Sequence, residues 1–352
     1  MSNDEVKVRP GATPGSLKDS EPIFVVGAPR SGTTLLQLIL DSHPDIAMNG
    51  EVHFFDQVLQ LRAQIPDLCA AGAVEHFFAQ LPRIDAFQYL PNLASQLGEV
   101  RARLASDARP TYERFFLYML EAPALAAGAK RCGEKTPENI RYLPDLTRIL
   151  PTAKIVHIVR DPRDVVSSLL KMPWAPQGVV ANALKWKIDM LFMRDFKRDG
   201  GRVHELRYED LLEHPEATLH ALCEFIGVSW THQMLQFHSI AHGRIKDEPW
   251  KRGTSRQLNE SARGRWRQDL SAGQVNVVEF VVRPFLEDYG YHPAGTAVRR
   301  RIALPYDVGT DLWRYVRGRT AERSRRTREA RDTIFGEERR LWSKLREALL
   351  TR

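Results

Sequence analysis

The sequence is first informative for what it lacks. Its 352 residues contain no apolar run of the roughly 18 residues that a transmembrane helix needs, and the segment after Met1 is polar, unlike a signal sequence. The three cysteines, Cys69, Cys132 and Cys223, form no Cys-x-x-Cys pair, which argues against a disulfide framework and a zinc site. We therefore expect a protein of the reducing cytoplasm that has no metal centre.

The chain also lacks an even distribution of charge. Its formal net charge is +7, yet residues 295–352 alone hold 16 Lys and Arg against 8 Asp and Glu. The rest of the chain has 35 basic against 36 acidic residues and is close to neutral. Because a nucleic-acid-binding domain carries a basic face, nucleic acid is not an expected partner of the main domain.

The most specific motif is a strand, a glycine loop and a helix. Residues 23–26 are apolar and predict a buried parallel strand, and an apolar-striped helix begins at Thr33. The loop between them, Gly27-Ala-Pro-Arg-Ser-Gly32, has the glycine spacing of a phosphate-binding loop. Such a loop directs backbone N–H groups and the positive end of the helix at an anion. The lysine of a nucleotide triphosphatase is missing after the second glycine, and the positive side chain is Arg30 instead.

A second candidate anion-binding segment follows another buried strand, over residues 154–159. Asp161 and Pro162 are typical of the N-cap and first turn of a helix. Arg160 precedes this helix and Ser168 lies within it, so a guanidinium and a hydroxyl are placed to flank one phosphate. Two anion-binding segments, without the lysine that a nucleotide triphosphatase has, favour a nucleotide with phosphates on two different ribose positions.

Strands and helices alternate along most of the chain. Strands are also predicted over 130–135 and 203–207, and helices over 138–149, 162–170, 178–198 and from 208 to about 227. This alternation predicts an α/β fold with a P-loop-like, mainly parallel sheet flanked by helices. We expect a disordered segment over 1–20, a main domain over 21–295 with a helical insertion over about 52–128, and a basic helical extension over 296–352.

Together the motifs resemble the sulfotransferases that use 3′-phosphoadenosine 5′-phosphosulfate (PAPS). Residues 27–36 are similar to the 5′-phosphosulfate loop of that family, and residues 155–168 to its 3′-phosphate segment. With an arginine in it, the first loop is similar to that of the branch formed by protein-tyrosine sulfotransferases and bacterial relatives. Residues 40–51, 133–137, 207–215 and 264–270 also match family segments, so the resemblance covers about residues 21–290.

The resemblance implies roles for individual residues. The residues that it places on PAPS are Arg30, Ser31, Gly32, Thr33, Thr34, Arg160, Ser168, Tyr208 and Arg265. Arg30 would also stabilise the charge that develops on the leaving oxygen. Glu51 is the candidate general base for an acceptor hydroxyl, and Lys135 is expected at the transferring sulfuryl group or the leaving oxygen. No metal is required for this chemistry.

Several alternatives stay open on the sequence alone. His53 is a second candidate for the base, and Glu51 could instead cap a helix over 52–61. The acceptor could be a small molecule, a lipid, a glycan or a peptide, with an amine in place of a hydroxyl. The insertion could cover the site or pack on the sheet. The extension could be a solvated charged face, or it could contact a membrane surface or a partner, such as a second copy in a homodimer. The rival functions are an ATP-dependent P-loop kinase and a non-catalytic anion- or partner-binding protein.

Overall fold

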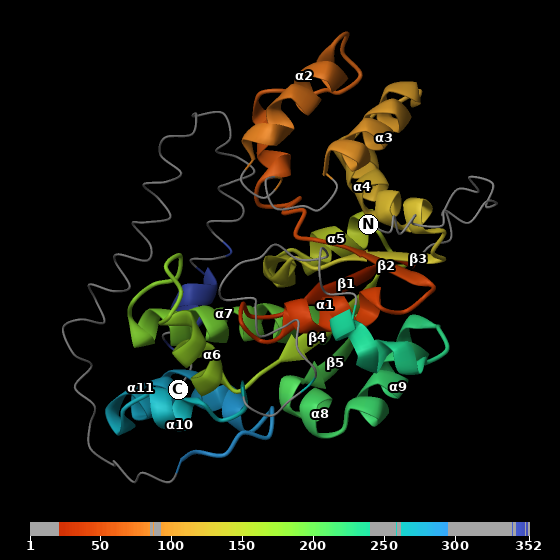
Figure 1. The fold of residues 1–352 in the computed structure, drawn as a ribbon. Coiled ribbons are helices and arrows are strands. Elements are labelled where there is room, and N and C mark those ends of the chain that lie inside the picture. The colour runs from red at the N-terminus through yellow and green to blue at the C-terminus, as the bar shows by residue number, and fades with distance from the viewer. Residues whose placement is uncertain are drawn as a thin grey trace, which may run out of the picture.

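A sheet of five parallel strands forms the centre of the protein (Figure 1). The computed structural model describes residues 21–84, 87, 93–239, 258, 262–294, 340, 343–348 and 350. The strands run in the order β2-β3-β1-β4-β5. Their bounds are β1 (Ile23–Val26), β2 (Ile46–Asn49), β3 (Arg131–Glu134), β4 (Lys154–Val159) and β5 (Val203–Arg207). The expected α/β fold with a mainly parallel sheet is thus confirmed.

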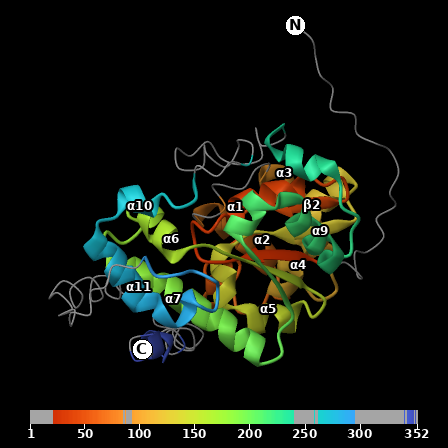
Figure 2. The same ribbon diagram turned by 90° about the horizontal axis from the view of Figure 1, so that it is seen from below.

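Helices cover both faces of this sheet, as Figures 1 and 2 show. One face packs against α4 (Tyr112–Ala127), α5 (Leu143–Ile149), α6 (Pro162–Leu169), α7 (Val179–Arg198) and α11 (Ala272–Leu286). The other face packs against α1 (Thr33–Asp41), α8 (Tyr208–Glu213) and α9 (Pro215–Ile226). The short α10 (Trp266–Asp269) lies against α6.

The burial of strand β1 on both faces explains why all four of its residues are apolar. Phe24 and Val26 join the core on the α7 side, whereas Ile23 and Val25 join the core on the α1 side. All four side chains are fully buried. A parallel strand that is covered on both faces needs apolar residues at every position, so strict alternation is absent.

The sequence analysis missed strand β2. Its four residues, Ile-Ala-Met-Asn, follow Pro44 and are too few to form a recognisable run. The strand pairs with β3 from Ile46 beside Arg131 to Asn49 beside Glu134. The Asn49 side chain donates to the carbonyl of Met119 at 2.8 Å, which ties the end of the strand to α4. This extra strand brings Gly50 and Glu51 to the carboxyl edge of the sheet.

Three predicted helices need correction. The helix expected from 208 to about 227 is divided into α8 and α9, because Pro215 has no N–H to continue the first segment. The helix expected over 138–149 is divided into a 3-10 helix, Pro137–Arg141, and α5, because Pro144 has no N–H to continue the first segment. The helix considered for 52–61 does not form over that range: residues 51–57 are irregular or turn, and a 3-10 helix covers Val58–Ala63. Glu51 is therefore not a helix cap.

The described residues between 52 and 128 are helical or irregular and hold no strand. The helix α4 belongs to the core, since Phe116 stacks on Phe54 with ring centroids 4.2 Å apart. In contrast, α2 (Ala73–Gln80) and α3 (Leu93–Ser106) extend away from the sheet (Figure 1). Among the described residues of the insertion, α4 therefore joins the layer on the sheet, whereas α2 and α3 lie outside it.

The two predicted terminal segments lie mostly outside the described residues. Residues 1–20 are not described, and only 340, 343–348 and 350 are described from the extension over 296–352. Residues 343–348 are helical and pack on α7 of the same chain, where Lys187 Nζ donates to the carbonyl of Ala348 at 2.7 Å. The expected homodimer stays a prediction. In the part of the chain that the structure describes, no helix is both long and apolar enough to cross a membrane.

Candidate active site

Candidate functional residues follow the carboxyl ends of all five strands. This is the edge at which parallel α/β sheets bind their ligands. The order across the sheet is Glu51 after β2, Lys135 after β3, Arg30 after β1, Arg160 after β4 and Tyr208 after β5. Residues that are far apart in the sequence are thus collected along one edge.

The loop after β1 depends on its glycines. A Cβ atom at Gly27 would lie 2.5 Å from the carbonyl oxygen of Ile158, and one at Gly32 would lie 2.5 Å from the ring of Tyr208. Gly32 has φ 100° and Arg30 has φ 74°, so the chain curls tightly before α1. Thr33 and Thr34 form the first turn of α1, where backbone N–H groups are free of helix partners. The loop has the shape of an anion cradle.

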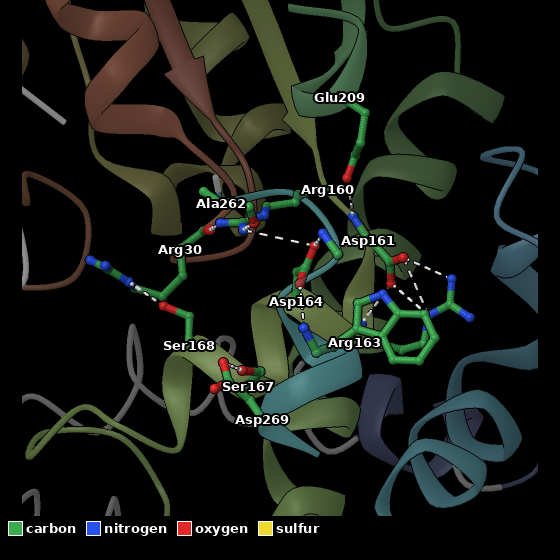
Figure 3. Close-up of polar contacts among 12 residues, drawn as sticks. Arg30, Arg160, Asp161, Arg163, Asp164, Ser167, Ser168, Glu209, Ala262 and Asp269 are labelled. Carbon is green, nitrogen blue, oxygen red and sulfur yellow. Dashed lines mark hydrogen bonds and ion pairs between the residues drawn. The ribbon is translucent and has the colours of Figure 1, made fainter. Parts of the chain in front are cut away.

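The two predicted anion-binding segments contact each other directly (Figure 3). Arg30 Nε donates to Ser168 Oγ at 3.1 Å, and Arg160 Nη1 donates to the carbonyl of Arg30 at 3.1 Å. The Arg160 guanidinium also lies 4.4 Å from the centroid of the Tyr208 ring. Arg30, Arg160, Ser168 and Tyr208 therefore belong to one site.

The helix α6 starts as predicted. Asp161 is its N-cap and accepts a hydrogen bond from the N–H of Arg163 at 2.9 Å. Arg163 is buried between the carboxylates of Asp161 and Glu279, both 2.7 Å away, so its charge supports the fold. Glu209 accepts from the N–H of Asp161 at 3.0 Å and fixes the turn that carries Arg160.

Asp164 attaches a remote segment to the site. Its carboxylate accepts from the N–H of Gly264 at 2.7 Å and from that of Trp266 at 2.9 Å. Burial raises the pKa of Asp164, although the charge of Arg160 and these two N–H groups oppose the shift. The Arg160 side chain donates to the carbonyl of Ala262 in the same segment. Arg265 lies between Gly264 and Trp266, and its side chain is exposed. The segment over 262–266 thus closes one side of the site.

A second polar cluster surrounds Glu51. The buried ammonium of Lys135 donates to Glu51 Oε1, and His53 Nε2 lies 3.3 Å from Glu51 Oε2. The other ring nitrogen of His53 lies 3.0 Å from Asp56 Oδ2. The N–H of Gly27 donates to the carbonyl of Pro137 at 3.5 Å, which joins the loop after β1 to the segment that carries Lys135.

The protonation state of His53 separates the two candidate bases. Burial alone would lower the pKa of His53, but the carboxylates of Asp56 and Glu51 raise it to about 11. The ring is therefore an imidazolium at neutral pH, with both nitrogens donating. An imidazolium has no lone pair with which to accept a proton, so Glu51 stays the candidate base.

Glu134 has a different role from Glu51, despite lying beside Lys135 in sequence. It is fully buried and accepts hydrogen bonds from Asn139 and from Thr136. Burial is the main cause that raises its pKa to about 7. A buried carboxyl that is bonded within the protein supports the turn after β3.

Sequence reasoning missed three supporting residues. Asp56 had a local signal, since an acid three residues after His53 can reach its ring. Asp164 and Glu209 had none, because their partners lie 100 and 48 residues away. In the described part of the chain, no group of three or more His, Cys, Asp and Glu side chains is arranged to hold a metal.

Two curated relatives are protein-tyrosine sulfotransferases. Protein-tyrosine sulfotransferase 2 of Gallus gallus is 24% identical over 295 residues, which cover 78% of this chain and 71% of its own. Protein-tyrosine sulfotransferase 1 of Homo sapiens is 24% identical over 288 residues, with coverage of 78% and 71%.

Solved structures show the same fold. The sulfotransferase domain from the curacin biosynthetic pathway superposes with a TM-score of 0.51 at 19% identity, covering 78% of this chain and 98% of that domain. The sulfotransferase domain from the Synechococcus PCC 7002 olefin synthase gives a TM-score of 0.51 at 19% identity, covering 78% and 96%. None of these proteins favours the kinase alternative. The model of the Sulfotransferase family matches residues 22–232, more than half of the sequence, and the chain therefore belongs to that family.

Proposed function

We propose that this protein transfers the sulfuryl group of PAPS to a hydroxyl group of an acceptor. The observation that carries the proposal is the direct contact of two anion-binding segments, through Arg30, Arg160 and Ser168, at the ends of β1 and β4. PAPS bears anionic groups on both sides of its ribose, and two adjoining cationic segments match that distribution. The resemblance of residues 27–36 and 155–168 to the PAPS-binding segments supports the same donor.

Unpaired polar atoms in this site fit a bound anion. Ser31 Oγ and Arg160 Nε are buried, and neither has a hydrogen-bond partner among the described residues. A buried polar atom that lacks a partner destabilises a protein, so such atoms are often satisfied by a ligand. Ser31 would serve the 5′ side of the nucleotide with the rest of its loop, while Arg160 and Ser168 would hold the 3′-phosphate.

The proposed mechanism divides the work among a few residues. PAPS supplies an activated sulfuryl group, which passes in line to the acceptor oxygen. Arg30, the loop N–H groups and the hydroxyls of Thr33 and Thr34 stabilise the negative charge that grows on the leaving oxygen. Lys135 lies on the neighbouring strand end and neutralises charge on the transferring group. Glu51 accepts the proton of the acceptor hydroxyl.

The acceptor is proposed at the level of its reacting group. Glu51 is one-third exposed, which leaves its carboxylate accessible to a hydroxyl that enters from solvent. The named relatives act, by their names, on protein tyrosine. We propose a hydroxyl of a small molecule, lipid, glycan or peptide for this chain.

Calorimetric binding of 3′-phosphoadenosine 5′-phosphate (PAP) tests the donor site, with AMP and ATP as controls. We expect PAP to bind more tightly than AMP or ATP. Arg160→Ala should weaken PAP binding by roughly 100-fold, because a charge-assisted hydrogen-bond pair contributes about 2–3 kcal/mol. The matched control is Arg202→Ala, since Arg202 precedes β5 at the opposite edge of the sheet. Equal affinity for PAP and ATP would contradict the proposal.

A second measurement tests the chemistry. Transfer of labelled sulfuryl from PAPS to a panel of phenols, alcohols and amines should be detectable in the wild type. Glu51→Gln should lower transfer by about 100-fold or more, within the usual contribution of a general base. Its affinity for PAP should be unchanged, because Glu51 lies at the acceptor side. Transfer that survives Glu51→Gln would exclude this carboxylate as the base.

A further inference from the structure

His53 adopts an unusual conformation in the segment after β2. Its φ is 50°, in the left-handed region that few residues other than glycine adopt, and its side chain is mostly buried. Strained conformations of this kind persist only where the surrounding structure enforces them, and they concentrate at functional sites. The two ring nitrogens contact two carboxylates, Glu51 at 3.3 Å and Asp56 at 3.0 Å.

The charges around His53 keep its ring protonated. Glu51 and Asp56 face it from its own segment, Glu138 acts on it from the 3-10 helix over 137–141, and Glu134 interacts with it from the end of β3. The neighbouring cation is on Lys135, which is itself paired with Glu51. The negative surroundings outweigh burial and raise the pKa of His53 to about 11.

The ion pair between Glu51 and Lys135 would break during the reaction. In the structure Lys135 contacts Oε1 and His53 contacts Oε2. If Lys135 neutralises charge on the transferring group, as proposed above, it must turn from Glu51 toward the donor. The contact between His53 and the other carboxylate oxygen does not involve Lys135, so it persists and orients Glu51.

We propose that His53, fixed by Asp56, is a positioning residue that holds Glu51 toward the acceptor while Lys135 engages the donor. This inference rests on the proposed function, specifically on Glu51 as the base. In this role His53 is not a base, because it keeps its own proton throughout the reaction. The Glu51–His53–Asp56 chain is therefore a fixed support and does not relay a proton.

The backbone of His53 allows a clean test. Its carbonyl accepts from the N–H of Gln57 at 3.0 Å and from that of Val58 at 3.2 Å, so the turn forms without the side chain. Asparagine tolerates the left-handed region well but is too short to bridge both carboxylates. His53→Asn should thus remove the support and preserve the turn. The control is His76→Asn, since His76 is exposed on α2.

The first readout needs no activity. Histidine ring signals of the full chain are followed by NMR from about pH 5 to about pH 9, the range in which an ordinary histidine loses its proton. The signal that disappears in His53→Asn should not titrate in the wild type, and Asp56→Asn should move its titration to lower pH. A His53 ring that titrates at an ordinary value would overturn the inference.

The second readout is the rate of sulfate release from PAPS to water at saturating PAPS. His53→Asn should lower kcat by about tenfold to 100-fold, the cost of a misplaced catalytic group, with the KM for PAPS unchanged. The acidic limb of its pH–rate profile should move to higher pH, because a positive charge beside the base is lost. The control variant should match the wild type in rate and profile.

The outcomes separate the two proposals. If the wild type binds PAP and releases sulfate, but His53→Asn is as fast as the wild type, only the role of His53 fails. If the wild type does not bind PAP, the proposed function fails and this inference fails with it.

Discussion

Replacing Gly32 with alanine tests whether the loop after β1 is shaped by close packing on Tyr208. The new Cβ would lie 2.5 Å from one ring carbon of Tyr208 and 2.9 Å from the next. Both distances are shorter than carbon atoms tolerate, so the ring or the loop must move. The backbone of Gly32 also has φ 100°, which an alanine rarely adopts.

The destabilisation expected for Gly32→Ala has two parts, and a substitution at a second glycine measures one of them alone. Alanine at a positive φ costs about 1–2 kcal/mol, and an overpacked contact costs a further 1–3 kcal/mol or so. Gly72 has φ 73°, but a Cβ atom added there would meet nothing within 4 Å, so Gly72→Ala carries the first part alone. We expect Gly32→Ala to destabilise the protein by roughly 2–5 kcal/mol and Gly72→Ala by roughly 1–2 kcal/mol.

Thermal unfolding and PAP calorimetry measure the two consequences. Each kcal/mol lowers Tm by roughly 2–4 °C in a large domain, so the two variants should be clearly separated. Gly32→Ala should also weaken PAP binding by about tenfold or more, because the displaced Tyr208 ring packs on the Arg160 guanidinium at 4.4 Å. Equal Tm values and equal PAP affinities for the two variants would refute this account of the loop.

Two further predictions concern Ser168 and His53. Ser168→Ala should weaken PAP binding by roughly fivefold to tenfold, the usual value of one hydrogen bond, whereas Ser167→Ala should not, because its hydroxyl is bonded to Asp269 at 2.7 Å. Calorimetry decides this, and equal losses would disprove separate roles. The pKa of His53 is raised from 6.5 to about 11, so the stability from its charge is complete below about pH 6.5 and is lost toward pH 11. Urea unfolding should therefore show the free-energy gap between wild type and His53→Asn narrowing from pH 7 upward, and a widening gap would contradict the assignment.

The parts of the fold and site that were predictable from the sequence have strong local signals. The strand β1 is a continuous apolar run, and β4 is apolar except for Lys154 and His157. The residues after them sit in turns with glycine or an Asp-Pro start. Strand, turn and helix follow each other within a few residues, so local chemistry defines the position of Arg30 and of Arg160. The order of elements then places both arginines at one edge.

The parts that were not predictable depend on contacts between distant segments. Strand β2 is too short to identify alone and is stabilised by pairing with β3, some 85 residues later in the chain. The same pairing brings Glu51 to Lys135, which no spacing in the sequence indicates. Asp164 reads as an ordinary acid in the first turn of a helix, yet it holds the N–H groups of Gly264 and Trp266.

The distribution of the site over all five strand ends has a consequence for folding. Glu51 follows one edge strand of the sheet and Tyr208 follows the other. A partly folded chain that lacks either edge strand cannot present the whole site, so a ligand that spans it binds only the complete sheet. At a concentration 100 times its Kd, such a ligand adds about 2.7 kcal/mol to global stability. Amide hydrogen exchange should then slow in β2 and β5 together, although the two strands share no hydrogen bond.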